Sequence, residues 1–254
     1  MNNRKIKTNL EKFYKTNKGY FDHMSETHDE IYFESIVRFI KNFNIKLDNK
    51  KILDIGCGSG SLIKVLRKES TKLKPYGIDI SNLGHPEKVM NFYQTDAESL
   101  PFKDKFFDLV FLVDILEHVV NPQAVLKEAI RVLSKGGYIL IRTPSILSPI
   151  IYKLSLKEYI RHQLGFYAGC SNDLSEIKRL TPNLKENVIG GDEDAVSGIF
   201  YDNLLQELSN NNIKVIKSET WGGGLKHPQL IRIANYIPFL QLLGSSITIL
   251  GKKF

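Results

Sequence analysis

Lys51-Ile-Leu-Asp-Ile-Gly-Cys-Gly-Ser-Gly-Ser-Leu62 combines a short apolar run, an acid and three glycines at alternate positions. The apolar run predicts a strand over residues 51–55, and the apolar spacing that follows predicts a helix over residues 60–69. Glycines let the backbone turn tightly and let a ligand approach closely, because they carry no Cβ. A helix that starts after such a turn offers N–H groups to a ligand carboxylate or phosphate. The stretch therefore predicts a ligand-binding turn; the alternative is a glycine-rich turn that binds nothing.

Strands and helices alternate along the rest of the chain. Strands are expected at residues 75–80, 89–93, 106–113, 138–142, 213–220 and 246–251, and helices at 29–43, 122–133 and 198–210. Lys135-Gly136-Gly137 is expected to end the helix over 122–133. The strands are almost continuously apolar, which is typical of a buried, mostly parallel sheet with helices on both faces. Residues 1–20 are polar and basic, and form either a mobile arm or a first helix.

The glycine spacing distinguishes two kinds of loop. A dinucleotide-binding loop reads G-x-G-x-x-G, whereas here the third glycine comes one residue earlier and Asp54 precedes the first. This order resembles motif I of the class I S-adenosylmethionine (SAM) dependent methyltransferases, commonly D-x-G-x-G-x-G. The resemblance implies that Asp54, Gly56, Gly58 and Gly60 shape the pocket for the methionine part of SAM. It also implies that Cys57 contacts the cofactor, as a small packing residue rather than as a nucleophile.

Acidic residues at the next two strand ends extend the resemblance. Asp79 ends the second strand, where the family has an acid that accepts both ribose hydroxyls, and Ile80 follows it. The alternative role of Asp79 is a helix N-cap, because Ser81-Asn82 comes next. Asp96 and Ala97 follow the third strand, where in the family an acid binds the adenine amino group and the next backbone N–H meets a ring nitrogen.

Val113-Asp-Ile-Leu-Glu-His-Val119 follows the fourth strand. It resembles the L-E-H-V segment of small-molecule methyltransferases, including the ubiquinone- and menaquinone-biosynthesis enzymes, and implies that Val113–His118 lines the wall nearest the transferred methyl group. His118 is the candidate catalytic residue, as a general base or an orienting group; the alternative is a structural cap. Asp114, Glu117 and His118 also resemble a metal site proposed for the ubiquinone-type enzymes, although we expect no metal here.

The resemblance implies one α/β domain over residues 1–254, with a Rossmann-like doubly wound sheet of seven mostly parallel strands and an antiparallel last strand. Its expected parts are an N-terminal helical arm at 1–47, a SAM-binding core at 48–143, a capping insertion at 144–197, and C-terminal strands at 198–254 with an apolar insertion at 220–245. Both insertions leave the carboxyl ends of strands, where such sheets bind ligands, so they are expected to cover an apolar acceptor. The alternatives are extra core, a dimer surface, or a face that rests on a membrane. Aromatic residues of the arm, Tyr20, Phe21 and Tyr32, with Asp22 and His23, are candidates to close over SAM.

Composition narrows the class of partner. The net charge is +7, but the lysines are scattered, which favours a solvated surface over a specific nucleic-acid interface. Two cysteines fit a reducing compartment, and the first residues lack the apolar core of a signal peptide. No run of about 18 apolar residues occurs. We therefore expect a cytoplasmic protein without a membrane span, with peripheral membrane contact and the oligomeric state left open.

Together these patterns predict SAM-dependent methyl transfer to a small-molecule acceptor of apolar or lipid-like character. Two other classes stay open: an RNA or protein methyltransferase, which the basic charge would suit, and a non-catalytic SAM-binding protein. Val113-Asp-Ile-Leu stands where DNA and protein N-methyltransferases carry an Asn/Asp-Pro-Pro-Tyr/Phe motif. This difference disfavours methylation of adenine N6 or glutamine.

Overall fold

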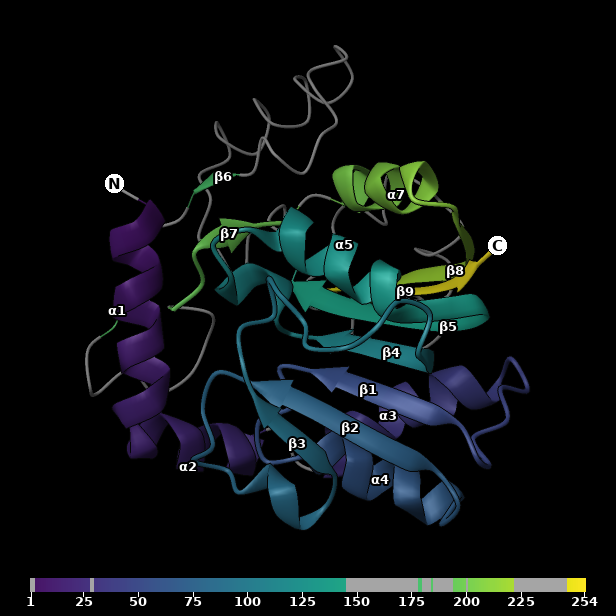
Figure 1. Cartoon of the computed structure of the whole chain (residues 1–254), viewed down its shortest axis with the longest axis horizontal. Helices are drawn as coiled ribbons and strands as arrows, with labels where there is room; N and C mark the ends of the chain where they lie inside the picture. The colour runs from purple at the N-terminus through teal and green to yellow at the C-terminus, as the bar shows by residue number, and fades with distance from the viewer. Residues whose placement is uncertain are drawn as a thin grey trace.

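Seven strands form one sheet in the order β3-β2-β1-β4-β5-β9-β8 (Figure 1). The computed structural model of the chain describes residues 3–27, 30–144, 178–179, 184, 194–199, 201–221 and 246–254. The strands of the sheet are β1 (Lys51–Ile55), β2 (Lys74–Asp79), β3 (Asn91–Gln94), β4 (Phe107–Val113), β5 (Leu133–Pro144), β8 (Ile213–Trp221) and β9 (Ser246–Lys253). The first five run parallel, whereas β9 is antiparallel to both β5 and β8. This topology confirms the predicted doubly wound sheet with an antiparallel last strand.

Helices cover both faces of this sheet (Figure 1). On one face lie α3 (Glu30–Lys41) and α4 (Ser61–Glu69), and on the other lie α5 (Pro122–Val132) and α7 (Tyr201–Asn210). Two short 3₁₀ helices, η1 (Pro86–Lys88) and η2 (Leu116–His118), follow β2 and β4. A separate antiparallel pair joins β6 (Lys178–Arg179) to β7 (Ser197–Gly198).

The central strands are buried on both sides. Along β4, Leu109 and Phe111 pack with α3 and α4, whereas Val110 and Leu112 pack with α5 and α7. All four side chains are buried. Because both faces of the sheet are covered, the strand sequence is continuously apolar rather than alternating.

The first two helices lie across one end of the sheet rather than on a face. α1 (Asn3–Thr16) and α2 (Lys18–Thr27) stand beside the ends toward which β1 and β2 point (Figure 1). Ile6 and Leu10 of α1 pack against Val120 and Val196. Of the two possibilities expected for residues 1–20, the helix is therefore confirmed.

The start of β5 differs from the sequence prediction. α5 ends at Val132, and Lys135-Gly136-Gly137 lies inside β5 rather than closing the helix. β5 pairs with β4 first at Leu133 and then from Tyr138 onward, so the residues between them bulge out of the ladder. Gly136 has φ 74°, a conformation that favours glycine. These glycines therefore shape an irregular strand entry, and the predicted helix stop is wrong.

The two predicted insertions, at 144–197 and 220–245, fall mostly outside the described residues. The expectation that they cap an acceptor therefore stays a prediction. In the part of the chain that the structure describes, no helix is long and apolar enough to span a bilayer.

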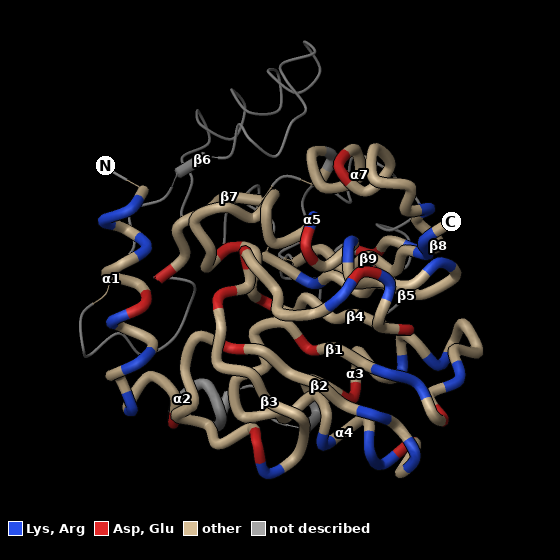
Figure 2. The backbone as a smooth tube through the Cα atoms, in the orientation of Figure 1, with Lys and Arg blue, Asp and Glu red and all other residues tan. Residues whose placement is uncertain are grey.

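Charge is distributed unevenly over this fold (Figure 2). Acidic residues cluster at the carboxyl ends of the central strands, and basic residues lie on α1 and at the opposite, amino ends of β1 and β2. The acidic group includes Asp54, Asp79, Asp114 and Glu117; the basic group at the amino ends includes Lys50, Lys51, Lys72 and Lys74. The sheet therefore presents an acidic edge where ligands bind in doubly wound folds.

Candidate active site

Three glycines in the left-handed region build the turn between β1 and α4. Their φ angles are 75° at Gly56, 50° at Gly58 and 75° at Gly60, values that L side chains rarely adopt. An added Cβ would come within 2.8 Å of Ile115 at Gly56 and within 2.5 Å of Val89 at Gly60. At Gly58 it would meet no atom within 4 Å. Gly56 and Gly60 thus permit close packing, whereas Gly58 faces open space.

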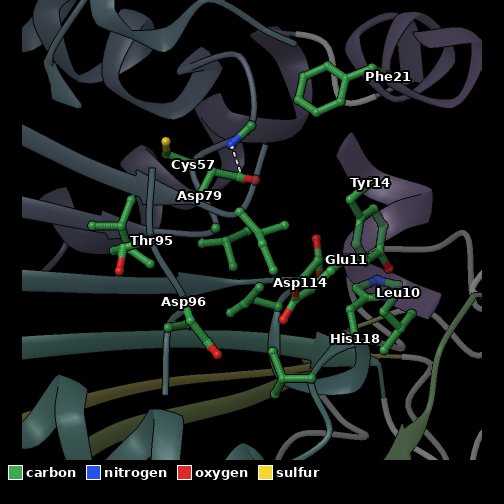
Figure 3. A pocket seen from close by; sticks show the side chains of 18 of the residues that line it. Leu10, Glu11, Tyr14, Phe21, Cys57, Asp79, Thr95, Asp96, Asp114 and His118 are labelled. Carbon is green, nitrogen blue, oxygen red and sulfur yellow. Dashed lines mark hydrogen bonds between the residues drawn. The ribbon is translucent and has the colours of Figure 1, made fainter. Parts of the chain in front are cut away.

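Asp79 braces this turn from the neighbouring strand. Its Oδ2 accepts a hydrogen bond from the Gly58 N–H at 2.9 Å (Figure 3). Its Oδ1 accepts one from the Ser81 N–H at 2.9 Å. Burial raises the pKa of Asp79, while the backbone donors oppose that rise. The next helical turn, η1, begins only at Pro86. Asp79 caps no helix, so the N-cap alternative is wrong.

Asp54 lies behind the turn and is almost fully buried, with 3% of its surface exposed. Burial, and after it the nearby Asp79 carboxylate, raise the pKa of Asp54 to about 7. Removing a carboxylate from water disfavours its charged form. Asp54 is therefore a carboxyl group whose charge changes near neutral pH.

A cavity of about 220 Å³ opens at the carboxyl ends of the parallel strands (Figure 3). Eight of the ten predicted cofactor contacts line it: Gly56, Cys57, Gly58, Asp79, Ile80, Asp96, Ala97 and Val113. The other two, Asp54 and Gly60, do not line it and instead support the turn. The cavity thus gathers residues from four separate strand ends.

Cys57 has the surroundings of a packing residue. Its side chain is buried, and its Sγ would be only 2.8 Å from a Cβ added at Gly77. Burial raises the pKa of the thiol well above its usual value. A thiol in such an apolar setting is a poor nucleophile.

α1 closes the cavity on the side of Asp96. The Lys7 ammonium lies 2.5 Å from Asp96 Oδ2 and 2.8 Å from Glu98 Oε2. The other oxygen of Asp96 accepts the Glu98 N–H at 2.9 Å. An ion pair thus connects the first helix to the end of β3 directly beside the cavity.

His118 lines the cavity on the side away from Asp96 (Figure 3). Its Nδ1 is 3.3 Å from Asp194 Oδ2, and its Nε2 is 3.8 Å from Glu117 Oε1. The same Asp194 oxygen accepts hydrogen bonds from the hydroxyls of Tyr14, at 2.6 Å, and Tyr20, at 2.9 Å. The imidazole therefore lies between two buried carboxylates at the cavity wall.

Asp114 lies next to this wall at the end of β4. Its backbone has φ 49°, and the Tyr32 hydroxyl donates a hydrogen bond to its carboxylate. The Arg142 guanidinium stacks over the Tyr32 ring at 4.3 Å. Tyr32 does not line the cavity, unlike Tyr20 and Phe21. Tyr32 therefore packs against Asp114 rather than over the cavity, whereas Tyr20 and Phe21 remain candidates to close over the cofactor.

The sequence prediction missed the part of the site that comes from distant segments. Lys7, Leu10, Glu11 and Tyr14 of α1 line the cavity, and Asp194 contacts His118. The apolar spacing of α1 indicates a helix, but no local pattern indicates the surface on which it packs. The residues just before Asp194 are polar and show no apolar periodicity in their sequence, so they do not reveal its position.

No group of three or more His, Cys, Asp or Glu side chains is placed to hold a metal ion, as far as the described residues extend. The three residues of the resembled metal site have different contacts: Asp114 binds Tyr32, Glu117 accepts from Thr143, and His118 meets Asp194. Their geometry lends no support to a shared ion.

Residues 53–141 match the sequence family described as a methyltransferase domain. The matched stretch runs from β1 into β5. It contains the glycine turn, the acids that end β2 and follow β3, and the segment before His118.

Three relatives differ in how much of the chain they share. Uncharacterized protein MJ1252 of Methanocaldococcus jannaschii is 26% identical over 246 residues, covering 93% of this chain and 90% of that protein. A ubiquinone biosynthesis O-methyltransferase of Hydrogenovibrio crunogenus is 30% identical over 118 residues, 42% of this chain and 47% of that enzyme. A tRNA U34 carboxymethyltransferase of Nautilia profundicola is 32% identical over 111 residues, 39% of this chain and 36% of that enzyme. The chain thus matches less than half the length of either enzyme.

The fold is also found in solved structures. The crystal structure of a SAM dependent methyltransferase from Archaeoglobus fulgidus aligns with a TM-score of 0.56 at 20% identity, over 88% of this chain and 94% of that one. This likeness concerns the fold, and the match to the methyltransferase domain concerns the sequence of residues 53–141. The cavity fits SAM, because the Cβ position of Gly58 faces open space and two strand-end acids, Asp79 and Asp96, border the cavity. Residues 53–141 therefore match a methyltransferase domain, and the chain has the fold of a SAM-dependent methyltransferase.

Proposed function

We propose that the protein methylates a small apolar or lipid-like acceptor, which it binds between the glycine turn and the first two helices. The observation that carries the proposal is the two-sided lining of the cavity. One side has the glycines and the acids at the ends of β2 and β3; the other is mainly apolar and aromatic, with Leu10, Tyr14, Tyr20, Phe21, Val119 and Val120. A mostly apolar wall with a few placed polar groups is typical of small-molecule sites.

We assign the cofactor contacts on the first side. Asp79 is proposed to accept the ribose hydroxyls, since each carboxylate oxygen already accepts one N–H and has capacity for a second donor. Asp96 and Ala97 are assigned to the adenine. Gly56, Cys57 and Gly58 are assigned to the methionine part, and Ile80 and Val113 to the apolar walls. Asp54 and Gly60 are assigned to the support of the glycine turn.

The second side is assigned to the acceptor. SAM, when bound, supplies a methyl group on a sulfonium sulfur, which is already electrophilic. The chain therefore contributes mainly by aligning the acceptor atom and excluding water. His118 is proposed as the general base for an acceptor hydroxyl or amine, because it lines this side of the cavity.

Binding measurements come first in testing the function. We expect calorimetric titration to give micromolar affinity for SAM and S-adenosylhomocysteine and no binding of NADH. Tritium-labelled SAM is then incubated with the protein and a panel that contains a prenylated phenol, a fatty acid, bulk tRNA and a denatured protein mixture. Label in the organic extract supports the proposed acceptor class. Label in the tRNA or protein fraction, with none in the extract, overturns it.

RNA methylation is the second candidate, and the charge of α1 favours it. Arg4, Lys5, Lys12 and Lys15 are exposed on this helix beside the cavity, where they would meet a phosphate backbone. Binding of RNA through these groups would weaken steeply with salt. We expect tRNA affinity to be weak and the acceptor reaction to change little between low and physiological salt. A strong salt dependence of the reaction would favour RNA.

A further inference from the structure

Asp194 brings a fully buried carboxylate to the place where the first two helices meet η2. None of its surface is exposed. Its Oδ2 receives the hydroxyls of Tyr14 in α1 and Tyr20 in α2, and lies 3.3 Å from His118 Nδ1 in η2. A carboxylate without solvent is costly unless it is paired. The role of Asp194 therefore depends on which of its partners balances its charge.

The position of Asp194 is fixed by its neighbours rather than by its own side chain. The N–H of Val196 donates to the Glu117 carbonyl at 2.8 Å, and the Ser197 hydroxyl donates to the Val119 carbonyl at 2.7 Å. Val196 also packs against Ile6 and Leu10 of α1. Because the backbone of this segment is held at η2, a change of the Asp194 carboxylate alone can be tested without removing the segment.

Of the three partners, His118 alone can balance the charge of Asp194. The two phenols are neutral donors, and burial, followed by Asp194 itself, raises the pKa of Tyr14 well above its usual value. Tyr14 thus stays protonated. Asp194 Oδ1 accepts no hydrogen bond from the described residues, and the 3.3 Å contact of His118 Nδ1 with Oδ2 is an ion-pair distance rather than an aligned hydrogen bond. The carboxylate therefore keeps capacity for a proton donor. An imidazolium at His118 would satisfy that charge.

We propose that Asp194 is a positioning residue, which holds His118 with its proton on Nδ1 and leaves Nε2 to accept a proton from the methyl acceptor. This rests on the proposed function of His118 as base. The acceptor oxygen or nitrogen forms the new bond to the methyl carbon as the carbon–sulfur bond breaks, and the sulfur keeps that electron pair. The proton of the acceptor passes to Nε2, and Asp194 stabilises the imidazolium. Acceptors are accordingly hydroxyl or amine compounds.

Other charges near the ring are part of this arrangement. Glu117 on the same short helix is 3.8 Å from Nε2, and Tyr14 packs edge-on to the ring with centroids 6.4 Å apart. Glu11 and Asp114 line the same cavity. Since Glu117 lies on the Nε2 side, a loss of Asp194 would favour protonation of Nε2 beside Glu117, which is the tautomer unsuited to a base.

The test reads the tautomer directly and requires no acceptor. Long-range ¹H–¹⁵N spectra are recorded on the whole protein labelled with ¹⁵N-histidine, and His118→Gln assigns the His118 signals. In the wild type we expect neutral His118 with the proton on Nδ1. In Asp194→Asn we expect the Nε2-protonated form and a titration midpoint lower by about one pH unit, because a nearby carboxylate favours imidazolium. An unchanged tautomer together with an unchanged midpoint would overturn the proposal.

A second variant should shift the titration midpoint of His118 in the opposite direction. Tyr14→Phe/Tyr20→Phe removes both phenol donors and leaves the carboxylate, so the His118 midpoint should rise and the Nδ1 proton should persist. A fall of the midpoint in this variant would show that general disturbance of α1 and α2, and not the Asp194 charge, controls the ring.

Titration with S-adenosylhomocysteine separates the two proposals. Retained affinity in Asp194→Asn shows an intact cofactor side. If the wild-type protein binds no S-adenosylhomocysteine, the cofactor assignment fails, whereas the tautomer result still decides the role of Asp194.

Discussion

The Asp79 carboxylate receives the Gly58 N–H at 2.9 Å, and this bond joins the end of β2 to the glycine turn after β1. One side chain thus both shapes the turn and borders the cavity. The loop and the acid, which the sequence presents as separate motifs, form one structural unit.

Asp79→Asn tests this unit. We expect the affinity for S-adenosylhomocysteine to fall between about tenfold and a hundredfold, since hydrogen bonds to a charged group contribute about 1.5–3 kcal/mol. Asp108→Asn is the matched control, because Asp108 Oδ2 accepts the Lys51 N–H at 2.9 Å at the other end of β1. Calorimetry on both variants measures the effect. Equal affinities in Asp79→Asn and Asp108→Asn would contradict the ribose assignment.

Gly58→Val tests the open side of the turn. The added side chain would enter space where no atom lies within 4 Å, so we expect cofactor binding to be lost. It also strains the backbone, because φ is 50°. Gly136→Val introduces comparable strain at φ 74°, likewise with no atom within 4 Å of the added Cβ, but away from the cavity. We expect both variants to lose about 1–2 kcal/mol of stability and Gly136→Val alone to keep its affinity; full binding in Gly58→Val would refute the assignment.

The raised pKa of Asp54, about 7, predicts a pH-dependent stability. An ordinary Asp in the unfolded chain has a pKa near 3.9, so between these values the folded state holds a proton that the unfolded state has released. Its contribution is therefore fully present below about pH 4 and is lost as the pH rises to about 7. An asparagine at position 54 does not titrate, so Asp54→Asn lacks this pH-dependent loss of stability. We expect the variant's stability relative to the wild type to increase over that window, by up to about 4 kcal/mol.

Denaturant unfolding of the cofactor-free protein at several pH values between 4 and 8 measures this difference. Above about pH 7 the two curves should run parallel. Parallel curves over the whole range would mean that Asp54 titrates normally in the folded protein.

Lys7→Gln tests the connection between α1 and β3. Lys7 pairs with Asp96 and Glu98 at the rim of the cavity, but all three side chains are partly exposed. Exposed pairs contribute about 0–1 kcal/mol, so we expect little change in stability. Once α1 is less firmly held, S-adenosylhomocysteine should dissociate up to about fivefold faster. Lys15→Gln, which among the described residues removes an ion pair with Glu11 inside α1, should leave the stopped-flow dissociation rate unchanged.

Local patterns predicted most of the sheet and most of the residues that line the strand-end side of the cavity. β1 and its glycine turn follow from one stretch of sequence, and Asp79 and Asp96 could be placed because the ends of parallel strands meet at one edge. The bulged start of β5 could not be predicted, since Lys135-Gly136-Gly137 has the composition of a helix stop as well as that of an irregular strand.

The other side of the cavity depends on tertiary packing. Tyr14 reaches it because α1 packs across the end of the sheet through Ile6 and Leu10. Asp194 reaches it because Val196 and Ser197 bind the backbone of η2. The resulting Tyr14–Asp194 hydrogen bond joins residues 180 positions apart, and no periodicity within either segment encodes such a pairing.

The insertion of β9 between β5 and β8 has a consequence for how the protein assembles. β5 ends at Pro144, yet its outer partner begins at Ser246, so the edge of β5 stays unpaired until a segment of chain far downstream arrives. Non-local pairing of this kind slows folding, and an open apolar strand edge invites association with other chains. The sheet is therefore most vulnerable to aggregation while it is being synthesised, and chaperone dependence should centre on this late step.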